Sequence, residues 1–334
     1  MKPFAFLIAA SANDAVAQHA QSDRSSFIAG GTNLVDLMRE NVSRPDTLID
    51  ITRLSEMATI EDLPGGGLRL GALVRNADTA YHPAVERRYP LLSQAILAGA
   101  SPQIRNMATN GGNLLQRTRC YYFYDTAMPC NKRAPGSGCP AVQGYNRIHA
   151  ILGQSEHCIA VFPSDMCVAL AALEAKVNVR GPNGTRQMEF ADFHRLPGKT
   201  PQVDNTLAAG ELVTSIDLPA EDFSAHSSYL KLRDRDSYAF ALVSVATALE
   251  FDGDRIARAR FALGGVAHKP WRRQEAETFL VGKMATPETF AAAAQLLLEG
   301  ATSYEHNAFK PLLAERAIVR NGLAARSTPF HASL

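Results

Sequence analysis

The residues best suited to chemistry are five cysteines, and all of them lie between positions 120 and 167. Thiolates are ligands of zinc ions and of iron–sulfur clusters. A structural zinc site usually takes cysteines that are separated by about two to four residues, and no such pair occurs here. An odd number of cysteines in a chain with ample core disfavours a disulfide framework. The spacing favours an iron–sulfur cluster and leaves zinc and unliganded thiols as alternatives.

Four of the cysteines fall in a segment that disfavours regular structure. The range 129–140 contains three prolines and two glycines, which are typical of loops. A bound cluster would fix the shape of such a loop, and its candidate ligands are Cys120, Cys130, Cys139 and Cys158. Cys167 instead lies in an apolar helical run, where a thiol is most simply a small buried core residue. Basic side chains in and before the loop either offset the charge of a cluster or are ordinary solvated charges.

Two glycine pairs could bind phosphate. Gly30-Gly31 follows the apolar end of a strand at 27–29 and precedes helical spacing at 34–40, and Gly111-Gly112 lies within 108–114. A strand, a glycine turn and a helix in succession offer backbone N–H groups to an anion. Neither pair has the three spaced glycines of the dinucleotide fingerprint or the lysine of the P-loop, so a Rossmann fold is excluded. An ordinary strand-to-helix turn remains open for each pair.

Hydrophobic periodicity predicts the elements that must position these residues. Strands are expected at 4–8, 47–51, 68–73, 211–218, 239–251 and 260–266, and helices at 14–21, 34–40, 91–100 and 287–300. The apolar N-terminus superficially resembles a signal peptide, but Asn13 and Asp14 interrupt it and Ser11 begins a capping box, which favours a strand followed by a helix. Gly264-Gly265 is interpreted as a strand end, and His268 and Trp271 as packing or interface residues. Arg235 and Tyr238 line a cofactor or form a charged hairpin turn.

Size and charge narrow the class of protein. A chain of 334 residues predicts about two domains. The net charge is +1 with interspersed signs, which gives no electrostatic case for nucleic acid or an anionic membrane as partner. No apolar run approaches the roughly 18 residues that a membrane helix requires, so no membrane insertion is expected.

Four motifs, at 27–34, 105–114, 163–166 and 229–231, occur in the order seen in FAD-binding subunits of molybdenum hydroxylases. That family includes xanthine dehydrogenase and carbon monoxide dehydrogenase. The cysteine segment further resembles the FAD subunit of bacterial periplasmic aldehyde oxidoreductase, a branch whose flavin subunit carries a 4Fe–4S cluster. The resemblance implies an α+β fold: a two-subdomain FAD-binding fold of the vanillyl-alcohol oxidase (PCMH-type) class and a smaller C-terminal α+β domain. It implies domains at 1–222 and 223–334, with an iron–sulfur loop at about 115–160.

The resemblance also implies the cofactor ligands. Asp165 would contact the adenosine side of FAD, Lys231 the flavin ring or its ribityl chain, and Leu207 would pack nearby. The cluster would be held by Cys120, Cys130, Cys139 and Cys158, and no catalytic residue is expected. The complete expected FAD set is Phe27, Ile28, Ala29, Gly30, Gly31, Thr32, Asn33, Leu34, Ala108, Thr109, Gly112, Asn113, Leu114, Gln116, Asp165, Leu207 and Lys231.

By this resemblance the chain is an oxidoreductase subunit in a heterotrimeric molybdenum-dependent aldehyde oxidoreductase. It would pass electrons from 2Fe–2S clusters on a small subunit to FAD and then to an external acceptor, while a large subunit holds molybdopterin. The alternatives are a stand-alone flavin dehydrogenase and a zinc-stabilised, non-catalytic assembly subunit. The expected location is periplasmic, by co-export with a partner subunit, or cytoplasmic, with no convincing signal peptide in the chain itself.

Overall fold

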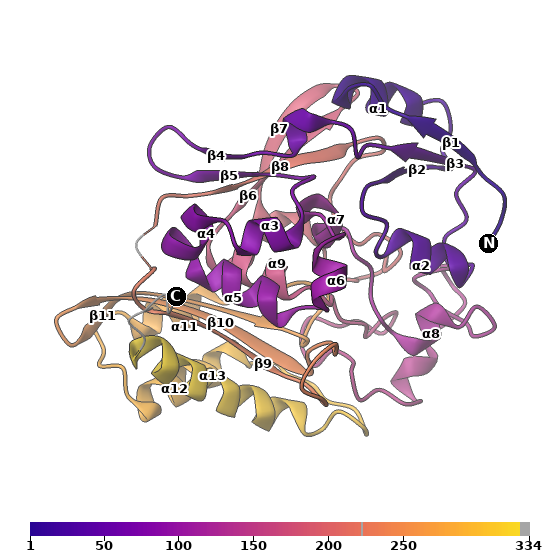
Figure 1. Cartoon of the computed structure of the whole chain (residues 1–334). Helices are drawn as coiled ribbons and strands as arrows, with labels where there is room; N and C mark the ends of the chain where they lie inside the picture. The colour runs from indigo at the N-terminus through magenta and orange to yellow at the C-terminus, as the bar shows by residue number, and fades with distance from the viewer. Residues whose placement is uncertain (222, 328–334) are drawn as a thin grey trace.

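The structure of the chain is a computed structural model that describes residues 1–221 and 223–327. Residue 222, where the first expected domain ends, and the tail 328–334 lie outside the described residues. The N-terminal lobe is a three-stranded parallel sheet of order β1-β3-β2 with two helices (Figure 1). Its elements are β1 (Ala5–Ile8), α1 (Ala12–His19), β2 (Ser25–Ile28), α2 (Leu34–Arg39) and β3 (Thr47–Asp50). The Ser11 side chain accepts a hydrogen bond from the Asp14 N–H and caps α1, so the predicted strand and helix are confirmed.

The second lobe is a five-stranded antiparallel sheet of order β4-β5-β8-β6-β7. Its strands are β4 (Ile60–Asp62), β5 (Leu68–Gly71), β6 (Lys176–Gly181), β7 (Gly184–Glu189) and β8 (Leu212–Leu218). The helices of this part are α3 (Asn76–Ala80), α4 (Pro83–Arg88), α5 (Pro90–Ala98), α6 (Pro102–Arg105), α7 (Asn110–Leu114), α8 (Tyr121–Tyr124), α9 (Asp165–Ala172) and α10 (Phe190–Phe193), with 3₁₀ turns η1 (Ser55–Met57) and η2 (Pro140–Val142). All eight residues of α9 are buried, which explains its uniformly apolar sequence.

The C-terminal part is an antiparallel sheet of order β11-β10-β9. It comprises β9 (Ser227–Leu232), β10 (Val243–Asp252), β11 (Arg255–Gly264), α11 (Gln274–Leu280), α12 (Pro287–Leu297) and α13 (Lys310–Ser327). Helices α11 and α13 pack on one face of this sheet, and α12 packs against these two helices. Helices α5 and α9 cover the other face of the sheet (Figure 1). The main core therefore crosses between the two parts, and Ala246, Ala248 and Ala262 of β10 and β11 belong to it.

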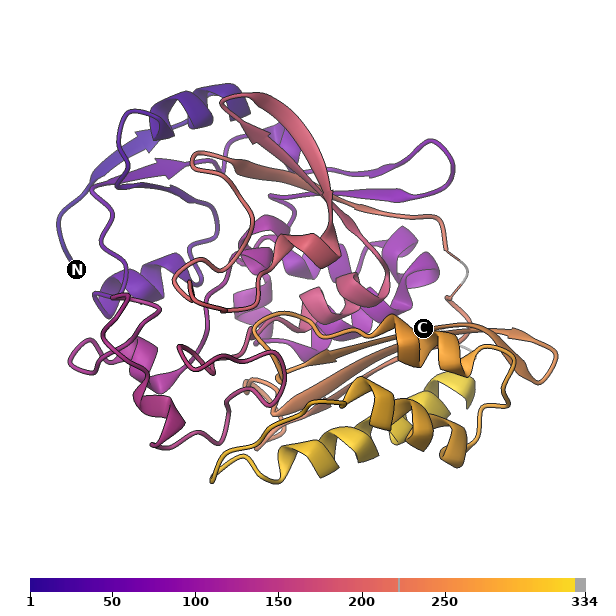
Figure 2. The same ribbon diagram turned by 180° about the vertical axis from the view of Figure 1, so that it is seen from behind.

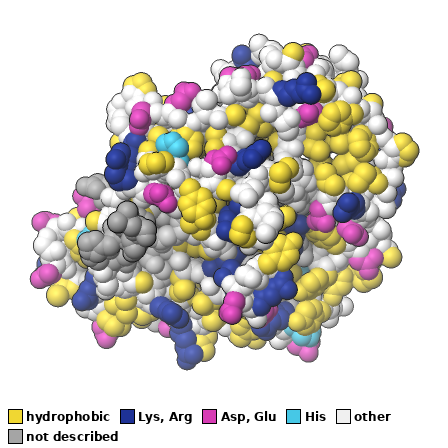
Figure 3. All heavy atoms as spheres, viewed as in Figure 1, with side chains coloured by type: hydrophobic (Ala, Val, Ile, Leu, Met, Phe, Trp, Pro, Cys, Tyr) yellow, Lys and Arg dark blue, Asp and Glu magenta, His cyan; other side chains and the backbone are white. Residues whose placement is uncertain are grey.

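The segment 115–160 contains little regular structure and lies between the N-terminal lobe and the C-terminal part (Figure 2). Hydrophobic side chains gather on the surface over the N-terminal lobe (Figure 3), where Phe6 and Ile8 of β1 are exposed. Within residues 1–221 and 223–327, no helix combines the length and the apolar character needed to cross a bilayer.

Two predictions need correction. The strand predicted from residue 239 begins at Val243, because residues 233–242 form the connection from β9 and Tyr238 has a left-handed φ of 50°. The glycine turn at 111–112 lies inside α7, because the Thr109 side chain accepts a hydrogen bond from the Gly112 N–H and starts the helix there.

Candidate functional site

The fold brings the two glycine motifs into contact. A Cβ atom on Gly30 would lie 1.8 Å from the carbonyl oxygen of Met107, so only glycine allows this approach. The next residue, Gly31, has a φ of 70°, which L side chains rarely adopt. The first loop thus lies directly against the segment that leads into α7, although the two are far apart in the sequence.

Two large pockets meet at these loops. The first has a volume of about 550 Å³, and from the expected FAD set it is lined by Phe27, Ile28, Ala29, Gly30, Gly31, Thr32, Asn33, Leu34, Thr109, Gly112 and Leu207. The second has a volume of about 610 Å³ and is lined by Thr32, Asn33, Ala108, Gly112, Asn113, Gln116 and Asp165 from the same set. Thr32, Asn33 and Gly112 line both pockets, so the glycine loops form the junction between them.

Asn33 offers an unused donor at this junction. Its Oδ1 accepts a hydrogen bond of 2.9 Å from the backbone N–H of Arg117. Its Nδ2 is buried and has no partner among the described residues. A buried N–H group without a partner is costly unless a ligand accepts from it. The junction therefore fits a bound anion such as a diphosphate.

A buried polar network supports the second glycine motif. Asn113 donates to Asn76 Oδ1 at 2.7 Å and accepts from Ser164 Oγ at 2.6 Å. Beneath it, Asn110 donates to Thr79 Oγ1 at 2.8 Å. The network fixes the orientation of the Asn113 side chain at the pocket wall.

Asp165 forms a buried ion pair at the second pocket. Lys231 Nζ lies 2.7 Å from Asp165 Oδ2, and the Tyr229 hydroxyl donates to Oδ1 at 2.7 Å. Lys231 also donates to the carbonyl of Ala98. Burial, followed by the charge of Asp165, raises the pKa of Tyr229 well above its ordinary value, which keeps this hydroxyl protonated as a donor.

Leu114 and Lys231 line neither pocket in the part of the chain that the structure describes. Leu114 is buried, and its carbonyl contacts the ring of His194 at 2.8 Å. Lys231 reaches the site only through Asp165. Several residues of the second pocket were absent from the expected set: Asn76, Arg119, Ser164, Arg235, Tyr238, Gly264 and Gly265. From the sequence, Arg235 and Tyr238 were expected to line a cofactor or to form a charged hairpin turn, and Gly264 and Gly265 were expected to end a strand.

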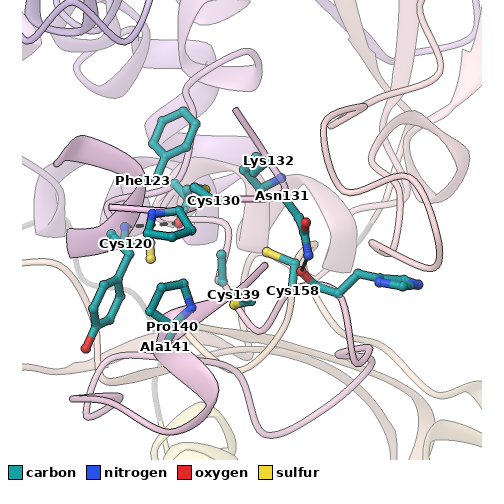
Figure 4. Close-up of a pocket in the computed structure, with 14 residues that line it drawn as sticks. Cys120, Phe123, Cys130, Asn131, Lys132, Cys139, Pro140, Ala141 and Cys158 are labelled. Carbon is teal, nitrogen blue, oxygen red and sulfur yellow. Dashed lines mark hydrogen bonds between the residues drawn. The ribbon is translucent and has the colours of Figure 1, made fainter. Parts of the chain in front are cut away.

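The four loop cysteines line one small pocket (Figure 4). The sulfur atom of Cys120 faces those of Cys139 and Cys158 across its interior in Figure 4. All five cysteines are unpaired, and Cys167 is fully buried in α9, as expected of a core residue. Among the described residues, no group of three or more His, Cys, Asp or Glu side chains is arranged to hold a single metal ion.

Backbone N–H groups point at these sulfurs. Tyr122 and Phe123 donate to Cys120, and Ala141, Val142 and Ile159 donate to Cys139. Burial nevertheless raises the pKa of Cys120 to about 12. A hydrogen bond from Cys158 lowers the pKa of Cys139 to about 6, and the same bond, with burial, raises that of Cys158. Backbone N–H groups directed at these sulfurs would stabilise them as thiolate ligands if an iron–sulfur cluster were bound.

The cysteine loop is fixed by side chains within and beside it. Asn131 Oδ1 accepts from the N–H groups of Gly136 and Gly138, and its Nδ2 donates to the carbonyl of His157. Asp204 joins this loop to its neighbours through Lys132 at 2.5 Å and Arg117 at 2.7 Å. Only 2% of the Lys132 side chain is exposed, so it is no ordinary solvated charge.

Two imidazoles touch the cysteine sulfurs. His149 Nε2 lies 3.1 Å from Cys120 Sγ, and His268 Nε2 lies 3.3 Å from Cys158 Sγ. Burial lowers the pKa of His149 to about 4 and that of His268 well below its ordinary value, so both rings are neutral near pH 7. Packing was the role expected for His268, and no feature of the sequence had singled out His149.

The match to known families agrees with this arrangement. Residues 2–221 match the family described as FAD binding domain in molybdopterin dehydrogenase. Residues 227–320 match the CO dehydrogenase flavoprotein C-terminal domain. The chain belongs to the family of FAD-binding subunits of molybdenum hydroxylases.

Individual relatives are consistent with this membership. The chain is 52% identical to the aldehyde oxidoreductase FAD-binding subunit PaoB of Escherichia coli (strain K12) over 88% of its own length and 89% of that protein. It is 29% identical to the glyceraldehyde dehydrogenase medium chain of Sulfolobus acidocaldarius over 84% of its length and 82% of that chain. A solved structure of carbon monoxide dehydrogenase from Hydrogenophaga pseudoflava matches with a TM-score of 0.77 and 26% identity, covering 98% of this chain and 99% of the other. These relatives belong to oxidoreductases, and the solved structure shares the mixed α/β architecture with a C-terminal domain.

Proposed function

We propose that the chain is the FAD- and 4Fe–4S-binding electron-transfer subunit of a heterotrimeric molybdenum-dependent aldehyde oxidoreductase. The observation that carries the proposal is the pair of pockets joined at two glycine loops, with a four-cysteine pocket close by in the same chain. The 52% identity to an aldehyde oxidoreductase FAD-binding subunit supports the choice of aldehyde as substrate class for the whole complex.

The pockets suit the shape of FAD, which has two ring systems joined through a diphosphate. In our proposal the diphosphate lies at the junction, where Asn33 Nδ2 and the backbone of the glycine loops donate to it. One ring system would occupy each pocket. Asp165, held by Lys231 and Tyr229, retains lone pairs that accept ribose or ribityl hydroxyls. The two-lobed arrangement supports the vanillyl-alcohol oxidase class for the FAD-binding part.

The chain's contribution to electron transfer is to hold the cofactors and set their electrostatics. FAD supplies the ability to accept electrons one at a time and to release them as a pair. Cys120, Cys130, Cys139 and Cys158 would hold the 4Fe–4S cluster. A structural zinc site usually takes cysteines in tight pairs about two to four residues apart, and these four cysteines contain no such pair.

The remaining components are proposed to lie on partner subunits: molybdopterin on a large subunit and 2Fe–2S clusters on a small one. Electrons would pass from the 2Fe–2S clusters to FAD and on to an external acceptor. We propose a periplasmic location by co-export with a partner, or otherwise a cytoplasmic one. Fractionation of cells that express the whole complex distinguishes the two locations.

The purified chain tests the cofactor assignment. We expect flavin absorption bands, a broad thiolate-to-iron shoulder, and about four irons per chain, the content of one 4Fe–4S cluster. Cys120→Ser is expected to reduce the iron content to background while the flavin content stays the same. Cys167→Ser, a matched change in a cysteine outside the pocket, is expected to keep both.

Other results would point elsewhere. A colourless chain that contains zinc would support the assembly subunit, and aldehyde oxidation by the isolated chain would support a stand-alone flavin dehydrogenase. Loss of iron in Cys167→Ser, with iron kept in Cys158→Ser, would contradict the ligand assignment.

A further inference from the structure

The two imidazoles beside the cysteine pocket come from different parts of the fold. His149 belongs to the segment 115–160, and His268 follows β11 in the C-terminal part. Their Nε2 atoms lie 3.1 Å and 3.3 Å from the sulfurs of Cys120 and Cys158, and both rings are buried. Two separate segments thus each place one ring nitrogen against one cysteine sulfur.

The position of the proton follows from the contacts of each ring. An imidazole Nε2 atom donates whenever it carries a proton, and it accepts only when the single ring proton lies on Nδ1. The Nδ1 atoms of His149 and His268 are buried and have no hydrogen-bond partner among the residues described. A proton on Nδ1 would leave a buried donor unpaired, and would turn the Nε2 lone pair towards a sulfur that carries no proton when it is a cluster ligand. The proton therefore belongs on Nε2, where it makes an N–H···S hydrogen bond.

The buried side chain of Lys310 forms hydrogen bonds to both segments. Lys310 Nζ donates to the carbonyl of His149 at 2.8 Å and to the carbonyl of Gly265 at 2.6 Å. The turn that carries His268 is closed by two hydrogen bonds between the backbones of Leu263 and Trp271. Lys310, the first residue of α13, therefore ties the backbone of His149 to the turn that carries His268.

We infer that His149 and His268 are positioning residues that donate N–H···S hydrogen bonds to Cys120 and Cys158 and raise the reduction potential of the cluster held there. The inference rests on the cluster of the proposed function. Hydrogen bonds to ligand sulfurs stabilise the more negative, reduced state over the oxidised state, because one added electron increases the charge on the sulfurs. The electron comes from an external reductant or a partner subunit.

The test is a redox titration of the full-length chain followed by electron paramagnetic resonance, with iron and flavin measured in each preparation. Leucine approximates the size of histidine and removes the donor, whereas glutamine keeps an N–H group at similar reach. We expect a lower midpoint potential in His149→Leu and in His268→Leu, and a lower one still in the double variant. His149→Gln and His268→Gln are expected to stay near the wild-type potential.

His226→Leu is the control, because this half-buried ring contacts Phe251 and the carbonyl of Ala325 and no cysteine. Its potential is expected to match that of the wild type. Unchanged potentials in both leucine variants, with full iron content, would overturn the inference. Loss of iron in both the glutamine and the leucine variants would also overturn the inference, because that pattern would show that the histidines act through packing and not as hydrogen-bond donors. If leucine variants lose iron while glutamine variants keep both iron and potential, the donor role is supported. A wild-type chain with flavin and no iron would instead refute the proposed cluster itself.

Discussion

At the scale of single residues, the flavin site depends on one close approach. The carbonyl oxygen of Met107 occupies the space that any side chain at Gly30 would need. The position of a Cβ atom is fixed by the backbone of its residue, and the oxygen belongs to the backbone of Met107, so the clash cannot be relieved by a side-chain rotation. The distance between the two loops, and with it the junction of the two pockets, is set by the absence of a Cβ atom.

Gly30→Ala is therefore expected to weaken FAD binding. The clash forces the loops apart at a cost of about 1–3 kcal/mol, which corresponds to roughly fivefold to 150-fold weaker binding if it falls on the cofactor site. Titration of the flavin-free chain with FAD, followed by flavin fluorescence, measures the change.

Gly300→Ala is the matched control. Its φ of 78° imposes strain, but a Cβ atom there meets nothing within 4 Å. We expect a small loss of stability and unchanged affinity for FAD. Equal affinities for FAD in wild type and Gly30→Ala would show that the loops can separate without loss of the site.

At the scale of elements, Asp204 links two loops that have no sheet between them. It pairs with Lys132 from the cysteine loop and with Arg117 from the segment that follows α7. Because Lys132 is almost fully buried, removing its partner would leave an uncompensated charge in the interior. The ion pairs of Asp204 therefore stabilise the shape of the loop that carries the cysteines.

Asp204→Asn is expected to lower the free energy of unfolding by roughly 3 kcal/mol. This value is near the lower end of the cost of removing one partner of a buried ion pair, because 27% of the Asp204 side chain remains exposed. Urea denaturation measures the loss. Asp62→Asn removes an exposed partner of Arg88 and is expected to cost about 1 kcal/mol or less. A similar cost for both variants would contradict the role of Asp204 as a clamp.

The same carboxylate predicts a pH dependence. Burial opposes ionisation, but the charges of Arg117 and Lys132 outweigh it and hold the pKa of Asp204 below its ordinary value of 3.8. The folded state therefore binds this proton more weakly than the unfolded state, and the stabilisation is fully present above pH 3.8. It is lost as the pH falls through the lowered pKa. The stability gap between wild type and Asp204→Asn is thus expected to be constant near neutral pH and to shrink only below pH 3.8, as urea denaturation across pH 3–7 would measure.

At the scale of the whole molecule, the second pocket joins the two parts of the chain. Ala108 and Asp165 line it from the first part, and Tyr238 and Gly264 line it from the second. Helices α5 and α9 pack against the C-terminal sheet, so the two parts also share a core. A ligand in this pocket therefore contacts both parts at once.

FAD is accordingly expected to stabilise both parts together. At a free concentration of about 100 times Kd, the gain is about 2.7 kcal/mol. Differential scanning calorimetry is expected to show one transition that moves to higher temperature with FAD. A C-terminal transition that stays fixed while an N-terminal one moves would show that the pocket does not couple the parts.

The sequence by itself determined the local features. Glycine pairs after an apolar strand identified the two loops, and prolines and glycines identified the cysteine segment as irregular. The full burial of Cys167 was expected from the continuous apolar run of its own helix. These features depend on neighbours within a few residues, so local propensity and periodicity carry them. The assignment of individual FAD and cluster ligands came from the family resemblance and stays a prediction.

Only the tertiary structure decided which distant residues meet. His268 reaches Cys158 across 110 positions, and Lys231 reaches Asp165 across 66. Gly30 meets Met107 because the parallel sheet and α7 bring their loops together. Such pairs are fixed by strand register and by packing between parts of the chain, and no local pattern encodes either. For this reason a histidine that reads as a packing residue in the sequence lies against a cysteine sulfur in the folded protein.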